Sequence, residues 1–298
     1  MKKVLFLVFV FVFVNVGAQV NSCDVNYDNK VNTADVVAIY TNIIDGTAPT
    51  KPEMTSKSFE ISGSLLNLVM MPVEGGTFMM GGTGEQVNPD KDETPHLVTL
   101  SDYYIEISEM PQVIWEAVMG SNPSEHVGSV YPVEMVSWND CQTFIKLLNL
   151  MLADQLNGMK FRLPTEAEWE FAARGGNKSM HYQYSGGNDI DKVAWYVGNS
   201  DGYTHAIMNK TSNELGLYDM SGNVFEWCQD VYDGSYSSKP QVNPTGGTSG
   251  DFRVRRGGSY DYSSVSYFRT ARRVVNGPAT KYDDLGFRLV LAHPLTTE

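Results

Sequence analysis

The sequence predicts an α+β domain in which short strands and helices are connected by long irregular loops. Apolar residues alternate over Val73–Met80, as in a strand with one buried face. Within Met110–Met119 the apolar spacing changes to that of a helix. From Gly175 onward, glycine, asparagine, aspartate and serine become frequent, and these residue types favour turns. Together the three observations predict a domain with little regular secondary structure.

Each further element has a local signal. Ser137 is the expected N-cap of a helix over Trp138–Leu152, which carries an apolar stripe. Thr165 followed by Glu168 has the pattern of a capping box for a helix over Glu166–Arg174. Two more short strands are expected over Leu97–Leu100 and Tyr103–Ile107.

The length and charge of the chain exclude one class of partner. With 298 residues, the chain is long enough for one large domain and a small module. Its net charge of −13 and pI near 4.8 argue against nucleic-acid binding, because phosphate recognition requires clustered lysine and arginine. An acidic composition instead suits metal-binding carboxylates. We therefore expect no nucleic acid among the partners.

Residues 1–19 have the pattern of a signal peptide. Lys2 and Lys3 precede an apolar run over Val4–Val14, and small residues follow at 16–18. The run is too short for a membrane span, so no transmembrane segment is expected after cleavage. We expect a secreted, periplasmic or cell-surface protein. A lipid anchor on Cys23 is a less favoured alternative, because residues 20–22 make a poor lipobox.

Cysteine is scarce after the leader. The remaining thiols are Cys23, Cys141 and Cys228. An odd and sparse set in an exported chain allows at most one disulfide, so the chain is not a cystine-stabilised scaffold. Cys141 and Cys228 are the plausible pair, and the sequence does not establish the bond.

A short acidic segment at 24–35 follows the spacing of an EF-hand calcium loop. Oxygen-bearing side chains fall at loop positions 1, 3, 5, 9 and 12, and position 7 of such loops contributes a backbone carbonyl. An apolar helix is expected to follow over Val36–Ile44. The expected calcium ligands are Asp24, Asn26, Asp28, Lys30 through its carbonyl, Asn32 and Asp35.

This loop and helix, residues 23–45, resemble a single dockerin repeat. Dockerins usually carry two repeats, so a lone repeat implies calcium binding more strongly than it implies a cohesin-like partner. Residues 46–65 contain two prolines and several threonines and serines, which predicts a linker to the large domain.

The large domain is organised around the motif GLYDMSGNVFEW at Gly216–Trp227. Asp219 and Glu226 lie on either side of a Gly-Asn turn at 222–223. Two carboxylates and the carbonyls of such a turn can converge on one hard cation. A capped turn beside a buried tryptophan explains the same residues without a metal. Spacing alone leaves both interpretations open.

The motif resembles the signature of the formylglycine-generating enzyme family, also called the sulfatase-modifying factor family. Residues 66–293 contain further blocks of that family in the expected order. The resemblance implies the formylglycine-generating-enzyme variant of the C-type-lectin-like fold, with two bound calcium ions. The supporting blocks are VEGGTFMMGG at Val73–Gly82, IWEAVMGSNPS at Ile114–Ser124, PVEMVSWNDC at Pro132–Cys141, FRLPTEAEWEFAARGG at Phe161–Gly176, RVRRGGSY at Arg253–Tyr260 and LGFRLVLA at Leu285–Ala292.

The resemblance also implies the calcium ligands, residue by residue. One site has Asp201 and the carbonyl of Tyr203 in a D-G-aromatic motif, but Trp195 stands where the family has an asparagine. The other site matches throughout, and its implied ligands are the side chains of Asp219 and Glu226 and the carbonyls of Gly222 and Val224.

The family's oxidase activity requires two cysteines that this chain lacks. In the family these cysteines follow a GGS sequence, hold copper(I), and convert a sulfatase cysteine to formylglycine with O₂. Here Tyr262 and Tyr267 stand at the corresponding offsets from Ser259. Copper(I) selects soft thiolate ligands, for which a phenol is a poor replacement. We therefore expect no copper and assign no catalytic residue, since the five histidines form no HExxH motif or i,i+4 pair either.

The segment after Ser259 has the composition of a recognition surface. Tyrosine and serine combine rigid aromatic area with adaptable hydrogen bonding. In C-type-lectin-like relatives, this region is the ligand-binding face. A degenerate surface without function explains the composition equally well. The candidate ligand-binding residues are Ser259, Tyr260, Asp261, Tyr262, Tyr267 and Arg269.

The leading prediction is an exported, calcium-binding, non-catalytic family member that binds a protein or a glycan. One alternative is an active sulfatase-modifying oxidase, against which the missing thiolates argue. Another is a dockerin-type scaffold component of an extracellular polysaccharide-degrading assembly.

Overall fold

The computed structural model describes residues 53–294 apart from 85, 87 and 235. The chain divides into two units, Met1–Glu53 and Met54–Glu298, and the second is described below. The expected signal peptide, calcium loop and dockerin-like repeat lie outside the described residues. The expected linker over 46–65 is too long, because Lys57–Phe59 within it forms strand β1 and the Phe59 side chain is buried.

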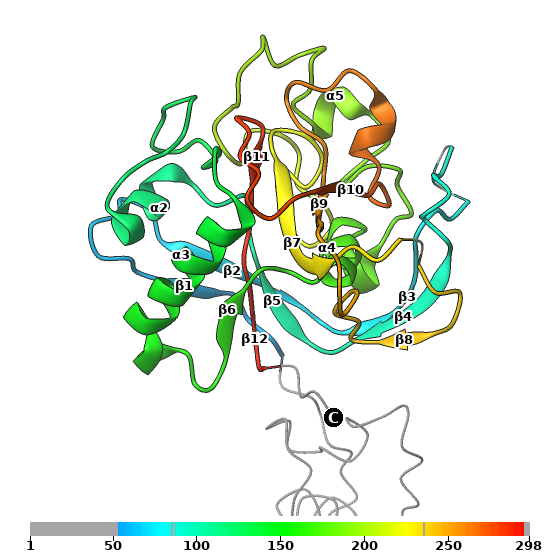
Figure 1. The fold of residues 1–298 in the computed structure, drawn as a ribbon, viewed down its shortest axis with the longest axis horizontal. Coiled ribbons are helices and arrows are strands. Elements are labelled where there is room, and N and C mark those ends of the chain that lie inside the picture. The colour runs from blue at the N-terminus through cyan, green and yellow to red at the C-terminus, as the bar shows by residue number, and fades with distance from the viewer. Residues whose placement is uncertain (1–52, 85, 87, 235, 295–298) are drawn as a thin grey trace, which may run out of the picture. The chain divides into compact units, whose positions relative to one another are not determined.

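The largest sheet contains strands from both the N-terminal and the C-terminal parts of the large domain. Its five antiparallel strands follow the order β1-β2-β5-β12-β6. The C-terminal strand β12 lies between β5 and β6, so the domain closes only when the end of the chain is in place (Figure 1). The strands are Lys57–Phe59 (β1), Leu68–Val73 (β2), Tyr103–Glu106 (β5), Lys160–Arg162 (β6) and Val290–Ala292 (β12).

Two smaller sheets complete the β-structure. A four-stranded sheet has the order β10-β9-β7-β11, in which β11 runs parallel to β7. A three-stranded sheet has the order β3-β4-β8, in which β8 runs parallel to β4. The strands are Gly76–Met80 (β3), His96–Leu100 (β4), Phe225–Val231 (β7), Gln241–Val242 (β8), Arg253–Arg256 (β9), Val274–Asn276 (β10) and Leu285–Gly286 (β11).

The single strand expected over Val73–Met80 is two strands in different sheets. The break falls at Gly75, whose backbone N–H donates to Asp102 Oδ1 at 2.8 Å. A Cβ at this position would lie 2.3 Å from the carbonyl oxygen of Leu100. The chain therefore requires glycine here to turn from β2 into β3.

The helices agree with the sequence signals. Ser137 caps α3 in a capping box with Asp140, and Thr165 caps α4 in the expected box with Glu168. Helix α2 ends at Gly120 in the left-handed conformation, with φ of 77°. The α-helices are Gln112–Met119 (α2), Trp138–Met151 (α3), Glu166–Ala173 (α4) and Ile190–Val193 (α5), and the 3₁₀ helices are Ala153–Gln155 (η1), Gly176–Lys178 (η2) and Val265–Phe268 (η3).

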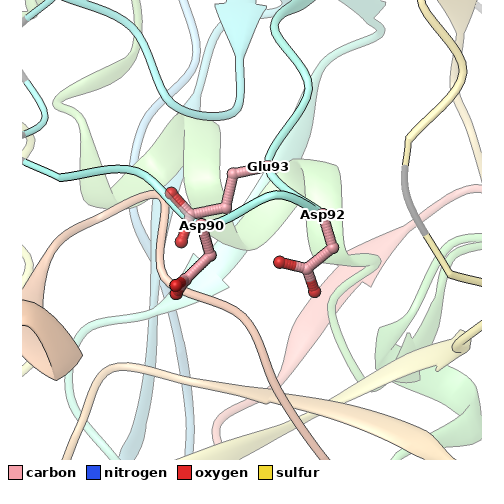
Figure 2. A group of neighbouring side chains, drawn as sticks. All are labelled: Asp90, Asp92 and Glu93. Atoms are coloured by element: carbon pink, nitrogen blue, oxygen red, sulfur yellow. The ribbon is translucent and has the colours of Figure 1, made fainter.

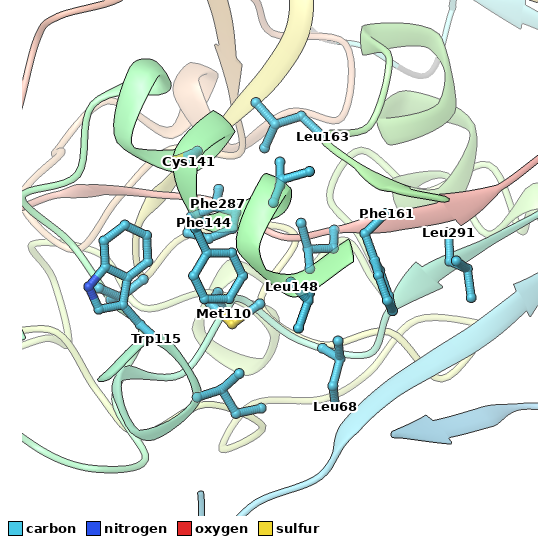
Figure 3. Close-up of a cluster of buried hydrophobic side chains, with 14 of the residues drawn as sticks. Leu68, Met110, Trp115, Cys141, Phe144, Leu148, Phe161, Leu163, Phe287 and Leu291 are labelled. Atoms are coloured by element: carbon cyan, nitrogen blue, oxygen red, sulfur yellow. The ribbon is translucent and has the colours of Figure 1, made fainter. Parts of the chain in front are cut away.

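The main hydrophobic cluster surrounds helix α3 (Figure 3). Phe144 from the buried face of α3 stacks on Trp115 of α2, with ring centroids 5.2 Å apart and an interplanar angle of 2°. Phe287 meets both rings edge-on. Because Phe287 lies between β11 and β12, this cluster attaches the C-terminal strands to the helical side of the domain.

The plausible disulfide between Cys141 and Cys228 is not formed. Both thiols are free and fully buried, and they belong to different hydrophobic clusters. Burial raises the pKa of both thiols well above the usual range, so neither is a reactive thiolate.

Buried arginines connect the sheets to helix α4. Arg256 of β9 is fully buried and forms ion pairs with Glu166 and Glu170 of α4. Arg273 also pairs with Glu166, with Nε and Nη2 each 2.8 Å from a carboxylate oxygen. The two carboxylates of α4 and the two guanidinium groups compensate one another away from water, as buried charges require.

A further buried pair joins segments that are far apart in the sequence. Arg269, after η3, donates two hydrogen bonds to Glu93, at 2.7 and 2.9 Å. Both side chains are fully buried. This bidentate pair fixes the segment before β4 to the loop that carries the candidate ligand-binding residues.

No helix among the described residues is both long enough and apolar enough to cross a membrane.

Removing one partner of the buried pair should destabilise the domain strongly. Arg269→Met leaves the Glu93 carboxylate buried without its bidentate partner, and we expect it to lower the free energy of unfolding by about 3–5 kcal/mol. Urea denaturation measures this loss. Lys192→Met is the matched control, because its partner pair with Asp189 is exposed and should contribute less than about 1 kcal/mol. Equal effects of the two substitutions would contradict the assignment.

Candidate functional site

The central motif forms a tight turn that leads into β7. Asp219, Gly222 and Asn223 all have positive φ, at 58°, 88° and 61°. A Cβ on Gly222 would lie 2.4 Å from the carbonyl oxygen of Trp195, so only glycine fits this close approach. The turn thus holds the two predicted metal-binding carboxylates on either side of a backbone segment that cannot shift.

Glu226 is committed to interactions within the protein. It is fully buried, and Arg288 donates to both of its oxygens at 2.7 Å. Trp169 Nε1 donates to Oε2 at 2.7 Å as well. The guanidinium of Arg288 therefore supplies the positive charge that the sequence-based hypothesis assigned to a cation.

Asp219 has the opposite character. It is 3% exposed, and its Oδ2 accepts the N–H of Met208 at 2.7 Å, whereas Oδ1 has no hydrogen-bond partner. Burial raises the pKa of Asp219 to about 6. A buried carboxylate oxygen without a partner fits a cation ligand. The residues present thus fit calcium at Asp219, while Glu226 would share its oxygens with Arg288.

Glu109 is a third carboxylate at this turn that the sequence patterns did not indicate. Its two oxygens accept hydrogen bonds from the backbone N–H of Val224 and the side-chain amide of Asn223, at 2.9 and 2.7 Å. Burial, and then repulsion from Asp219, raises its pKa well above the usual range. In the sequence, Glu109 lies shortly before the block Ile114–Ser124. That position does not indicate that its carboxylate belongs to this turn.

The first implied calcium site has less support in the geometry. Asp201 and Tyr203 lie in an exposed turn, and the Tyr203 side chain is 61% exposed. Trp195, in place of the family's asparagine, stacks on His205 with ring centroids 3.7 Å apart. The ammonium of Lys210 lies 3.8 Å from the Trp195 ring. An indole offers no oxygen ligand, so this site lacks one of its expected donors.

The two residues at the copper-binding offsets lie side by side. The rings of Tyr262 and Tyr267 are 4.6 Å apart, and both lean edge-on against Phe225 at the start of β7. Helix η3 carries Tyr267 back toward Tyr262. The pair therefore occupies one location, as the resemblance implies for the two cysteines, but presents phenols instead of sulfur.

Two arginines border the tyrosine pair. Arg255 lies over Phe225 at 4.0 Å, and its Nη1 is 3.7 Å from Asp284. Arg272 lies over Tyr267 at 4.5 Å. The RVRR block at 253–256 contains three arginines. The sequence alone does not tell which of them lies beside the tyrosines. We call Tyr262, Tyr267, Arg255 and Arg272, together with the neighbouring exposed Tyr282, the tyrosine face.

The structure divides the other candidate ligand-binding residues between interior and surface. Ser259 is fully buried and donates to Asp284 at 2.8 Å, and Tyr260 is 4% exposed and donates to Asp283 at 3.0 Å. Asp261 is exposed. Arg269 is fully buried and hydrogen-bonded to Glu93, so the prediction that it contacts a ligand is wrong. It stabilises the fold instead.

Asp90, Asp92 and Glu93 form the only group of three potential metal-binding side chains found in the described part of the chain (Figure 2). Arginine already compensates this group. Arg269 holds Glu93, and Arg272 contacts Asp90. Asp92 accepts the hydroxyl of Tyr232 at 3.1 Å. The cluster therefore contributes to the framework under the tyrosine face.

Comparisons with known proteins agree with the resemblance. Residues 64–293 match the family model of the sulfatase-modifying factor enzyme 1-like domain. The chain is 33% identical over 241 residues to "Chaperone protein LppX" of Paenibacillus barcinonensis, covering 65% of this chain and 79% of that protein. It is 26% identical over 297 residues to the formylglycine-generating enzyme of Mus musculus, covering 77% and 76%. It also spans 39% of the serine/threonine-protein kinase Pkn1 of Chlamydia trachomatis, at 31% identity.

Solved structures give the same answer for the fold. The structure titled "Treponema denticola variable protein 1" superposes with a TM-score of 0.72 and 31% identity, covering 81% of this chain and 100% of that one. PvdO from Pseudomonas aeruginosa superposes with a TM-score of 0.66 at 23% identity, covering 80% and 99%, and this likeness concerns the fold. Because the family model spans most of the chain and the fold agrees, the chain belongs to the sulfatase-modifying factor enzyme 1-like family, which includes the formylglycine-generating enzymes.

Proposed function

We propose that the chain is an exported, calcium-stabilised and non-catalytic member of this family that binds a protein or glycan through the tyrosine face. The observation that carries the proposal is the pair Tyr262 and Tyr267, which lie 4.6 Å apart at the offsets of the copper-binding cysteines. Phenols are hard, weakly basic donors and are poor ligands for copper(I). Both cysteines of the described residues are buried in hydrophobic clusters.

The composition of the tyrosine face supports recognition over decay. The rings of Tyr262 and Tyr267 pack edge-on against Phe225, while Arg255 lies over Phe225 and Arg272 lies over Tyr267. Rigid aromatic side chains with arginine are the residue types that dominate the energy of binding interfaces. Relatives named for chaperone and variable-protein roles are consistent with non-catalytic members of the family. A C-type-lectin-like variant of the fold is part of this proposal.

Calcium enters the proposal through Asp219. Its buried oxygen without a partner is the donor most in need of a cation, and the carbonyls of the same turn would add neutral oxygens. The EF-hand-like loop at Asp24–Asp35, the cohesin-like partner and export all concern residues outside the described part, and they rest on the sequence patterns alone.

The oxidase alternative predicts a product that the proposal excludes. The purified chain, incubated with copper, O₂ and a peptide containing CxPxR, should form no aldehyde, because no thiolate pair is available to hold copper(I). Mass spectrometry and hydrazide labelling detect the aldehyde, and an active formylglycine-generating enzyme serves as positive control. Formation of formylglycine by this chain above the level without enzyme would end the proposal.

Binding should depend on the tyrosine pair. In a glycan array and a library of extracellular protein domains, we expect the bound ligand to lose affinity about tenfold or more with Tyr262→Ala or Tyr267→Ala, as for buried aromatic anchors. Phe252→Ala is the control, because Phe252 is 50% exposed and lies outside the tyrosine face. A ligand that binds both alanine variants as tightly as the unchanged chain would place recognition elsewhere.

Calcium removal should destabilise the large domain through Asp219. The melting temperature of a chain beginning at residue 53 should fall in chelator, and Asp219→Asn should remove most of that calcium dependence because a charged ligand is lost. Asp201→Asn, at the poorer site, should change the calcium dependence less. Identical melting temperatures in excess calcium and in chelator would rule out a calcium ion at this turn.

A further inference from the structure

A cavity lined by none of the tyrosine-face residues lies beside helix α4. It has a volume of about 370 Å³, within the range of small-molecule sites. Strands β3, β4 and β8, the end of β7 and the start of helix α4 all contribute to its wall. The chemistry-bearing side chains that line it are His96, Glu166, Asp230, Asp233, Tyr236 and Arg273.

Arg273, the cation of this cavity, already uses four of its five N–H donors within the protein. Its Nε and Nη2 hold the carboxylate of Glu166, and its Nη1 donates to the carbonyls of Asp92 and Gly234 at 3.2 and 2.7 Å. An anionic guest would therefore meet a guanidinium whose charge Glu166 already compensates, beside the carboxylates of Asp230 and Asp233. The cavity is unsuited to an anion.

Asp230 and Asp233 are the two aspartates that line the cavity. Asp230 is 4% exposed, and its Oδ2 accepts the backbone N–H of Glu166 at 2.8 Å, while neither aspartate forms an ion pair with a described residue. Asp233 is exposed at the cavity wall. The His96 ring also lines the cavity and offers a face on which a cation can rest, whereas Arg273 already lies over the neighbouring Tyr236 ring at 3.9 Å.

From this arrangement we propose that the cavity binds a small protonated amine, whose ammonium pairs with Asp230 and Asp233 while its carbon chain lies along Met80, Ala167 and Val242. The site is separate from the tyrosine face, and it does not depend on the function proposed above.

The ionisation of Asp230 supports this proposal. Burial, and then repulsion from Glu166, raises the pKa of Asp230 to about 8, while the N–H of Glu166 lowers it. An ammonium that pairs with the carboxylate must therefore displace its proton. The other charged groups that face Asp230 are Glu168 of α4, Arg273, Arg162 of β6, Arg253 of β9, and Asp233 and His96 at the cavity.

Calorimetry with the full chain and 1,5-diaminopentane tests the site. Glutarate and pentane-1,5-diol are the matched anionic and neutral probes, and only the diamine should bind. Only the ionised form of Asp230 can pair with the diamine. The affinity for the diamine should therefore rise about fifty-fold from pH 6 to pH 8. At pH 7, binding should release close to one proton, seen as a change in apparent enthalpy between phosphate and Tris buffers.

Variants separate the site from general effects. Asp230→Asn should lose at least tenfold in affinity and remove the pH dependence, and Asp233→Asn should weaken binding without removing it. The asparagine still accepts the Glu166 N–H, so the fold should persist at pH 6, where Asp230 is protonated. Asp261→Asn, an exposed position that does not line the cavity, should bind as the unchanged chain does. Absence of diamine binding, equal binding of the diol, or unchanged binding by Asp230→Asn would each overturn the proposal.

A pH series of melting temperatures gives an independent check on Asp230. Its pKa is raised by folding, so stability should fall as pH rises from the unfolded value near 4 through about 8. Asp230→Asn removes this penalty, and the variant should melt at a higher temperature than the unchanged chain at pH 9. Near pH 5 the two should be closest. A constant difference between them over this range would contradict the ionisation assigned to Asp230.

Discussion

The architecture depends on charges that are buried in compensating pairs. Arg288 with Glu226, Arg269 with Glu93, and Arg256 with Glu166 and Glu170 are all removed from water. Most of these pairs join segments far apart in the sequence, in a domain whose strands are mostly short. Because a buried charge without a partner is costly, each pair forms only when its two segments are correctly placed. The strands are too short for their backbone hydrogen bonds to fix the positions of the loops. The buried ion pairs fix these positions instead.

This constraint also separates what the sequence could predict from what it could not. The helices α3 and α4 and their caps were predictable, because Ser137 and Thr165 act within one turn of chain. The division of Val73–Met80 was not, because it depends on the approach of Leu100 to Gly75 from another strand. Strand β7, seven residues long, lies where turn-forming residues predicted little regular structure, and tertiary pairing with β9 and β11 outweighs that local preference.

The site shows the same division. Tyr262 and Tyr267 were assigned to the copper-binding offsets from the sequence, and their rings lie 4.6 Å apart because helix η3 carries Tyr267 back toward Tyr262. The partners that define the site's chemistry come from elsewhere in the chain: Arg288 for Glu226, and Glu93 for Arg269. No periodicity in the sequence indicates which arginine meets which carboxylate. Arg269 was therefore expected on the binding surface, and the structure assigns it to the interior.

The central claim is that phenols have replaced the thiolates on which oxidase chemistry in this family depends. The most direct measurement is the metal content of the protein purified from its native source under anaerobic, reducing conditions. We expect the protein to contain bound calcium. We expect its copper content to be far below one ion per chain. Stoichiometric copper that is lost in a Tyr262→Phe, Tyr267→Phe double variant would contradict the central claim.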